Sequence, residues 1–154
     1  MSSPLVERRE YYAGYMDAWF NKNVEGLSTE ETVNLLGQTL AVLWESARKT
    51  LSEVTLMAVM DRVILINSES FSFLSLVKVE LGGVRVKELE RTASLLRKNA
   101  VVGAAKDVLT DFLTIIGNIT GEVISRTLIT KLSRVISKDS LSGFKKTRKE
   151  GKAI

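Results

Sequence analysis

One long amphipathic stretch decides the fold, residues 28–51, which read STEETVNLLGQTLAVLWESARKTL. It opens on Ser28 and places Glu31 three residues later. This is the capping-box spacing, in which the serine hydroxyl accepts from the glutamate amide and the glutamate carboxylate accepts from the serine amide. Apolar residues then recur every three or four positions, at Val33, Leu36, Leu40, Leu43, Ala47 and Leu51. The stretch therefore predicts a long helix that is buried along one side.

The segments on either side of this stretch also have helical spacing. Ser3 and Pro4 form a favourable helix start, with serine as the N-cap and proline at the first helical position. Apolar and aromatic residues continue that pattern as far as Asn21 to Asn23. A third helix is expected from Ser52 to about Ile66. Three consecutive helices with short connections indicate a bundle.

Residues 76–87 change to a period of two. Val77, Val79 and Leu81 alternate with polar residues on one side of Gly82-Gly83, and Val84 and Val86 alternate on the other. Two alternating runs joined by two glycines predict a short β-hairpin. An isolated hairpin is marginally stable in water, so this one is expected to pack on the helices or to pair with a second chain.

Helical spacing returns from Val101 to Ile136. A single uninterrupted helix over this range would be about 50 Å long, which is unusual for a small domain. Either the helix breaks near Gly117-Asn118, or another chain covers its apolar flank. The expected fold is therefore mainly α, a bundle of four to five helices with a small β-hairpin.

Gly117 and Gly121 stand four residues apart in this last segment. Glycine costs about 1 kcal/mol relative to alanine within a helix, so a compensating role is expected. Core packing, a contact between two chains and a helix break are the three alternatives. We expect the apolar surplus of the segment to favour a homodimer through Phe112, Ile116, Gly117, Gly121, Ile124, Arg126 and Leu128. Arg126 has the alternative of a surface ion pair with Glu122.

The net charge of +4 is confined to one end of the chain. Residues 138–154 hold six basic and two acidic residues, whereas residues 1–137 are balanced. We expect one helical domain over residues 1–137 and a flexible basic tail over residues 138–154. The tail either serves solubility or contacts phosphates of nucleic acid or of an anionic membrane. The candidate contacts are Lys145, Lys146, Arg148, Lys149 and Lys152.

Aromatic residues form a second candidate site. Tyr11, Tyr12, Tyr15 and Trp19 share the first helix, and Trp44 lies on the second. At helical spacing such residues more often belong to a core than to an interface or a ligand pocket. If they do form a pocket for an apolar small molecule, its residues are Tyr11, Tyr15, Trp19 and Trp44.

The inventory of catalytic groups is poor. The chain has no Cys and no His, which excludes thiolate and imidazole catalysis and the usual zinc ligands. Asp107 and Asp111 are one helical turn apart and could hold a metal through oxygen, but a solvated helix face is the favoured interpretation. We therefore expect no cofactor and no enzymatic activity. A regulatory module that homodimerises and binds a protein partner, with signalling as one role, is the leading hypothesis.

Membrane and export signals are not expected. The longest stretch without charge, from Thr32 to Trp44, is 13 residues long. This is shorter than the roughly 20 residues that span a bilayer. The N-terminus reaches charged residues before any apolar stretch, which is atypical of a secretory signal. The expected location is the cytoplasm.

Overall fold

The computed structural model describes residues 4–121 and 126–133. The long helices are α1 (Pro4–Asn23), α2 (Thr29–Ala47), α3 (Glu53–Ser68) and α5 (Lys98–Thr120). The shorter elements are the 3-10 turns η1 (Ser72–Leu76) and η2 (Ala93–Leu95), the strands β1 (Lys78–Glu80) and β2 (Gly83–Arg85), and helix α4 (Lys87–Arg91). Residues 126–133 are also helical. The predicted fold class, a mainly α bundle with a small hairpin, is confirmed.

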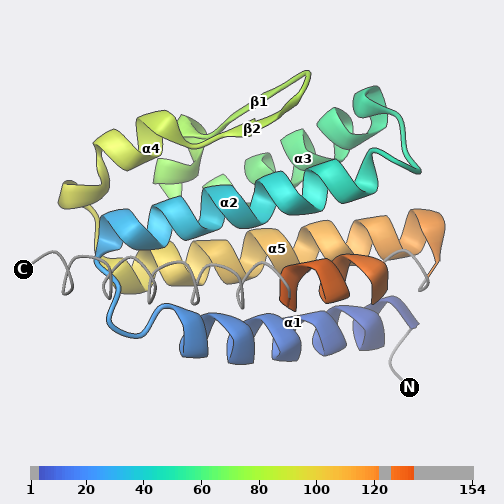
Figure 1. Ribbon diagram of the computed structural model, residues 1–154, viewed down its shortest axis with the longest axis horizontal. Coiled ribbons are helices and arrows are strands. Elements are labelled where there is room, and N and C mark those ends of the chain that lie inside the picture. The colour runs from blue at the N-terminus through green and yellow to red at the C-terminus, as the bar shows by residue number, and fades with distance from the viewer. Residues whose placement is uncertain (1–3, 122–125, 134–154) are drawn as a thin grey trace, which may run out of the picture.

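Helix α5 is the centre of the bundle. It packs against α1, α2 and α3. Figure 1 shows α5 between α1 and α2, with α3 behind α2 and the helical residues 126–133 in front of α5. Helices α1, α2 and α3 alternate in direction along this axis. A helix that contacts three others has few solvent-facing positions, and α5 accordingly buries twelve of its residues.

Local sequence accounts for the starts of α2 and α3. The Ser28 hydroxyl accepts from the Glu31 amide at 3.1 Å, and the Glu31 carboxylate accepts from the Ser28 amide at 3.0 Å. The predicted capping box is therefore confirmed. Ser52 caps α3 in the same manner by accepting from the Thr55 amide at 3.1 Å. These caps satisfy backbone donors that the helix itself leaves without partners.

The hairpin also lies where the alternation predicts it. Val79 pairs with Val84 and Glu80 with Gly83 across the two antiparallel strands, so Leu81 and Gly82 form the turn. Gly82 and Gly83 have φ of 96° and 142°. Strand β2 packs on α2 and strand β1 on α3. Helices of the same chain thus support the hairpin.

The last predicted helix requires a correction. Gly117 and Asn118 remain helical, and α5 ends only at Thr120. Gly121 follows with φ 85° and ψ 173°, a conformation that is essentially restricted to glycine. Gly121 is exposed and lies beyond the helix, so the interpretation in which it shares a packed helix face with Gly117 is wrong. Its role is to end α5.

A second correction concerns apolar burial after position 100. Phe112, Ile116 and Leu128 are fully buried within one chain, so the expectation that a second chain must cover them is wrong. The break at Gly121 precedes a helical segment that lies against α1, where the Tyr15 hydroxyl and the Ser133 hydroxyl are 2.8 Å apart. The chain thus covers Phe112, Ile116 and Leu128 itself, whereas Ile119 stays 51% exposed. The predicted boundary between residues 137 and 138 lies outside the described residues.

Among the described residues, no helix has the length and apolar content needed to cross a membrane.

Candidate functional site: the α3–α5 face

Exposed apolar side chains concentrate on α3 and α5. In the described part of the chain, seven large apolar residues are exposed, and four of them belong to these two helices. They are Val54 (72% exposed), Leu65 (69%) and Ile66 (46%) on α3 and Ile119 (51%) on α5. The other three, Tyr11, Leu81 and Leu95, lie separately on α1, the hairpin and η2. A concentration of exposed apolar residues is typical of an interaction surface.

Helix α3 is apolar on both sides. Leu56, Met60 and Val63 are buried against the bundle. On the opposite side, four exposed residues follow helical spacing and form the α3 outer stripe: Val54, Ala58, Asp61 and Leu65. Three of these four residues are apolar, and Asp61 places a charge between Ala58 and Leu65. The outer stripe is therefore an exposed and mostly apolar face of the bundle.

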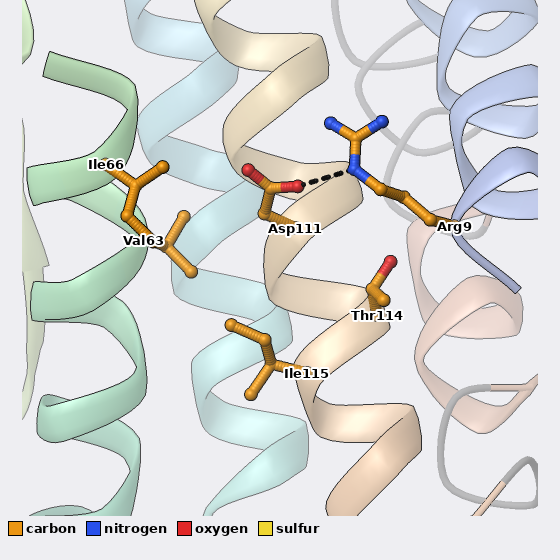
Figure 2. Close-up of a pocket in the computed structure, with 6 residues that line it drawn as sticks. All are labelled: Arg9, Val63, Ile66, Asp111, Thr114 and Ile115. Carbon is orange, nitrogen blue, oxygen red and sulfur yellow. Dashed lines mark hydrogen bonds and ion pairs between the residues drawn. The ribbon is translucent and has the colours of Figure 1, made fainter. Parts of the chain in front are cut away.

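A cleft lies beside this stripe, between α3 and α5. Its volume is about 320 Å³, and it is lined by Arg9, Val63, Ile66, Asp111, Thr114 and Ile115. Figure 2 shows Val63 and Ile66 on α3 facing Ile115 on α5, with Asp111 on α5 between α3 and Arg9, which reaches it from α1. The apolar surface of α3 thus continues across the cleft onto α5.

A polar network joins three helices at this cleft. The Arg9 Nε donates to Asp111 Oδ1 at 3.0 Å. The buried Asn67 donates through Nδ2 to Asp111 Oδ2 and to the Val63 carbonyl, each at 2.9 Å. Both carboxylate oxygens of Asp111 therefore accept hydrogen bonds from protein donors. The network fixes α1 and α3 to α5, which makes the cleft a rigid part of the surface.

Asp107 lies one turn before Asp111 on α5. Partial burial raises the pKa of the Asp107 carboxyl, and the nearby Arg9 opposes that shift. The two aspartates therefore differ, since Asp111 is held by an ion pair with Arg9 and Asp107 has no ion pair with any residue that the structure describes. No group of three or more His, Cys, Asp or Glu side chains suitable for a metal occurs among the described residues.

The aromatic residues of the first helix do not assemble into one pocket. Tyr11 is exposed and stacks edge-on against Tyr12, with ring centroids 5.5 Å apart. Trp19 lies near the end of α1 and Trp44 near the end of the antiparallel α2, which places them toward opposite ends of the bundle. Both indoles are buried, and neither ring nitrogen has a hydrogen-bond acceptor among the described residues. Trp19 and Trp44 are core residues.

The residues predicted for the dimer interface do not form one exposed surface among the described residues. Phe112, Ile116 and Gly117 are buried in α5, and Leu128 is buried in the helical segment that follows. Gly121 and Arg126 are exposed. Ile124 and the basic residues Lys145, Lys146, Arg148, Lys149 and Lys152 lie outside the described residues. Contacts of the basic tail with phosphates therefore stay a prediction.

Sequence reasoning missed the outer stripe of α3, although a signal was present. Ten of the thirteen residues from Val54 to Ile66 are apolar, which is more than one buried face of a helix requires. The C-terminal segment also has more apolar residues than one helix face requires, but most of them are buried within the chain.

The chain matches no family model, no curated protein and no solved structure.

Proposed function

We propose that the protein is a non-enzymatic interaction module that homodimerises through the outer stripe of α3 and the adjoining part of α5. One observation carries the proposal, namely the exposure of Val54 and Leu65 on a helix whose opposite side is already buried in the core. Burial of a Val or Leu side chain contributes about 1.5–3 kcal/mol relative to exposure. In a symmetric dimer each such contribution occurs twice, which supports association at micromolar concentration.

This proposal keeps the homodimer expected from sequence but moves its interface. Phe112, Ile116 and Leu128 are enclosed by their own chain and offer no surface to a partner. The α3 outer stripe replaces them as the contact. The surfaces that the dimer leaves free would take a protein partner in a regulatory role, and we place the protein in the cytoplasm.

The test is self-association of the full chain with Leu65→Lys as the disrupting variant. Lysine suits the last turn of α3 because cations are favourable near a helix C-terminus. It also stands four residues after Asp61, which is a favourable ion-pair spacing. The single chain should therefore fold normally, as circular dichroism would verify. Leu95→Lys is the matched control, since Leu95 is 85% exposed on η2, away from α3.

Sedimentation at several concentrations is the measurement. We expect wild type and Leu95→Lys to shift from monomer to dimer in the micromolar range. Leu65→Lys should raise the dissociation constant by more than about tenfold, because about 1.4 kcal/mol corresponds to tenfold and the contact is lost twice. Wild-type protein that stays monomeric throughout the micromolar range would overturn the proposal.

A further inference from the structure

The cleft between α3 and α5 has an apolar side and a basic side. Val63 and Ile66 on α3 face Ile115 on α5, whereas Thr114 lies on the side of α5 nearer to Arg9 (Figure 2). The cleft volume of about 320 Å³ is at the small end of the range for ligand pockets. The shape and lining therefore suit a small molecule that has one apolar end and one polar end.

The Arg9 guanidinium has hydrogen-bond donors to spare on the basic side. It pairs with Asp111 through Nε alone, at 3.0 Å. Its two amino groups have no partner among the residues that the structure describes. A guanidinium is a rigid fork of N–H groups that matches the two oxygens of a carboxylate, so these amino groups can hold a second carboxylate by two hydrogen bonds.

Arg8 adds a second positive charge at this side of the cleft. Its Nη1 donates to the side-chain oxygen of Asn118 at 2.7 Å, and that acceptor is neutral. Asp111 and Asn118 are seven residues apart on α5, or about 10 Å, so the contacts of the two arginines lie on either side of Thr114. That separation is about one Debye length at 0.1 M ionic strength, so both charges act on an anion above Thr114.

The acidic groups near the cleft do not cancel this charge. Both oxygens of Asp111 already accept hydrogen bonds, one from Arg9 and one from the buried Asn67. Asp107 lies one turn before Asp111 on α5, and Glu69 follows Asn67 on α3, so both lie toward the opposite end of the cleft. Two guanidinium groups thus stand beside one carboxylate, which leaves a positive surplus where the spare donors are.

We propose that this cleft binds a monocarboxylate with a short alkyl chain. The carboxylate pairs with the amino groups of Arg9 above Thr114, and the alkyl chain crosses α5 onto Ile115, Val63 and Ile66. The ion pair fixes the position of the headgroup, and burial of the chain supplies most of the affinity. The site is built from one chain and uses the cleft rather than the outer stripe of α3, so it goes beyond the proposed homodimer.

The first experiment is a titration of the full-length chain with octanoate, kept below the concentration at which it forms micelles. Calorimetry should show saturable binding at one site, with a dissociation constant on the order of 1 mM or tighter. Amide NMR shifts should concentrate at Val63, Ile66, Thr114 and Ile115. Hexanoate should bind roughly tenfold more weakly, because it lacks two methylene groups. An absence of saturable octanoate binding would overturn the proposal.

A comparison with 1-octanol tests the role of charge, because it has the same chain length and no carboxylate. It should bind at least about tenfold more weakly than octanoate, since it cannot form the charged pair with the guanidinium. Equal binding of the two compounds would show a cleft that recognises only the alkyl chain, which would contradict the assignment of Arg9.

Arginine variants then locate the headgroup. Arg9→Met should weaken octanoate binding at least about tenfold, and Arg8→Met roughly threefold, because Arg8 contributes its charge without a direct hydrogen bond. Arg85→Met is the matched control, since Arg85 forms an ion pair with Glu80 on the hairpin at 2.7 Å. Circular dichroism would verify the fold of each variant. Unchanged binding by Arg9→Met, or an equal loss in all three variants, would overturn the site.

A variant of the apolar side leaves the Arg9–Asp111 ion pair intact. Ile66→Ser should weaken octanoate binding about fivefold or more, because it removes alkyl surface from the cleft. Ile66 is 46% exposed, so the change costs little core packing. Leu95→Ser is the matched control, because Leu95 is 85% exposed on η2 and should leave binding unchanged. Equal affinities of Ile66→Ser and wild type would place the ligand elsewhere and contradict the proposal.

The octanoate site and the proposed function fail independently. Sedimentation without octanoate decides whether the chain forms a homodimer, and the titrations decide whether the cleft binds a carboxylate. A monomer that binds octanoate would overturn the homodimer alone, and a dimer that does not bind it would overturn the site alone.

Discussion

Gly37 lies on α2 where the chain returns after the hairpin. A Cβ at this position would stand 2.6 Å from Cγ2 of Val86, a buried β-branched side chain with little rotamer freedom. We predict that Gly37→Ala lowers the free energy of unfolding by about 1–3 kcal/mol through overpacking. Chemical denaturation would measure the change.

Gly14 provides the matched control for this prediction. It lies on the exposed face of α1, and a Cβ there would have nothing within 4 Å. Gly14→Ala should therefore raise the free energy of unfolding by about 0.5–1 kcal/mol, because alanine favours the helix. A loss of stability in both variants, or in neither, would contradict the explanation based on Val86.

At the residue scale, the two aspartates of α5 show that spacing in the sequence does not identify the partners of a side chain. Asp107 and Asp111 were equivalent in sequence, as two carboxylates one turn apart. Folding brings Arg9 and Asn67 to Asp111 from residues 102 and 44 positions away in the chain. Those partners come from α1 and α3, and no local pattern indicates them.

At the scale of elements, the capping box of α2 is coupled to pH. The Ser28 amide, followed by the Ser28 hydroxyl, lowers the pKa of the Glu31 carboxyl. A carboxyl with a lowered pKa in the folded state stabilises the protein above its ordinary pKa, and this contribution is lost as the pH falls through the folded-state value.

We predict that Glu31→Gln destabilises the protein at pH 7 and that its difference from wild type disappears below the usual titration range of glutamate. Glutamine can still accept from the Ser28 amide, so the comparison isolates the charge. Urea denaturation at a series of pH values is the measurement. Glu30→Gln, an exposed neighbour outside the capping box, is the control and should show a smaller dependence on pH. A difference between Glu31→Gln and wild type that does not change with pH would contradict the prediction.

Helix starts were predictable and the end of α5 was not, for a physical reason. Ser28 and Ser52 carry their own capping acceptors, so the signal is local. Gly117 and Gly121 are both glycines in an apolar helical pattern, and only the observed φ of 85° distinguishes Gly121 as the stop. Glycine tolerates helical and left-handed backbones alike, so sequence leaves both options open.

At the scale of the whole molecule, one long-range hydrogen bond closes the connection between α1 and α5. The Lys98 ammonium donates to the Val24 carbonyl at 2.6 Å, across 74 residues of chain. The Val24 carbonyl also accepts from the Leu27 amide at 3.0 Å, so the lysine is its second donor. We predict that Lys98→Met lowers the free energy of unfolding by about 0.5–1.5 kcal/mol, because it removes this hydrogen bond while the Leu27 amide still satisfies the carbonyl.

Lys87→Met is the control for the loss of this hydrogen bond, since Lys87 is an exposed lysine at the start of α4. It should leave stability within about 0.5 kcal/mol of wild type. Thermal and urea denaturation of the three proteins would decide the matter. Equal stability of wild type and Lys98→Met would show that the Leu27 amide alone is sufficient for the Val24 carbonyl.

The sequence by itself determined the helices, their N-terminal caps and the hairpin, because these depend on contacts between residues a few positions apart. Periodicity also identified which side of α2 is buried. Tertiary structure alone decided which apolar surplus stays exposed. Phe112, Ile116 and Leu128 are covered when the chain breaks at Gly121 and folds against α1, whereas Ile119 and the outer stripe of α3 stay exposed. Burial is a property of all the neighbours of a residue, and most of those neighbours are distant in sequence.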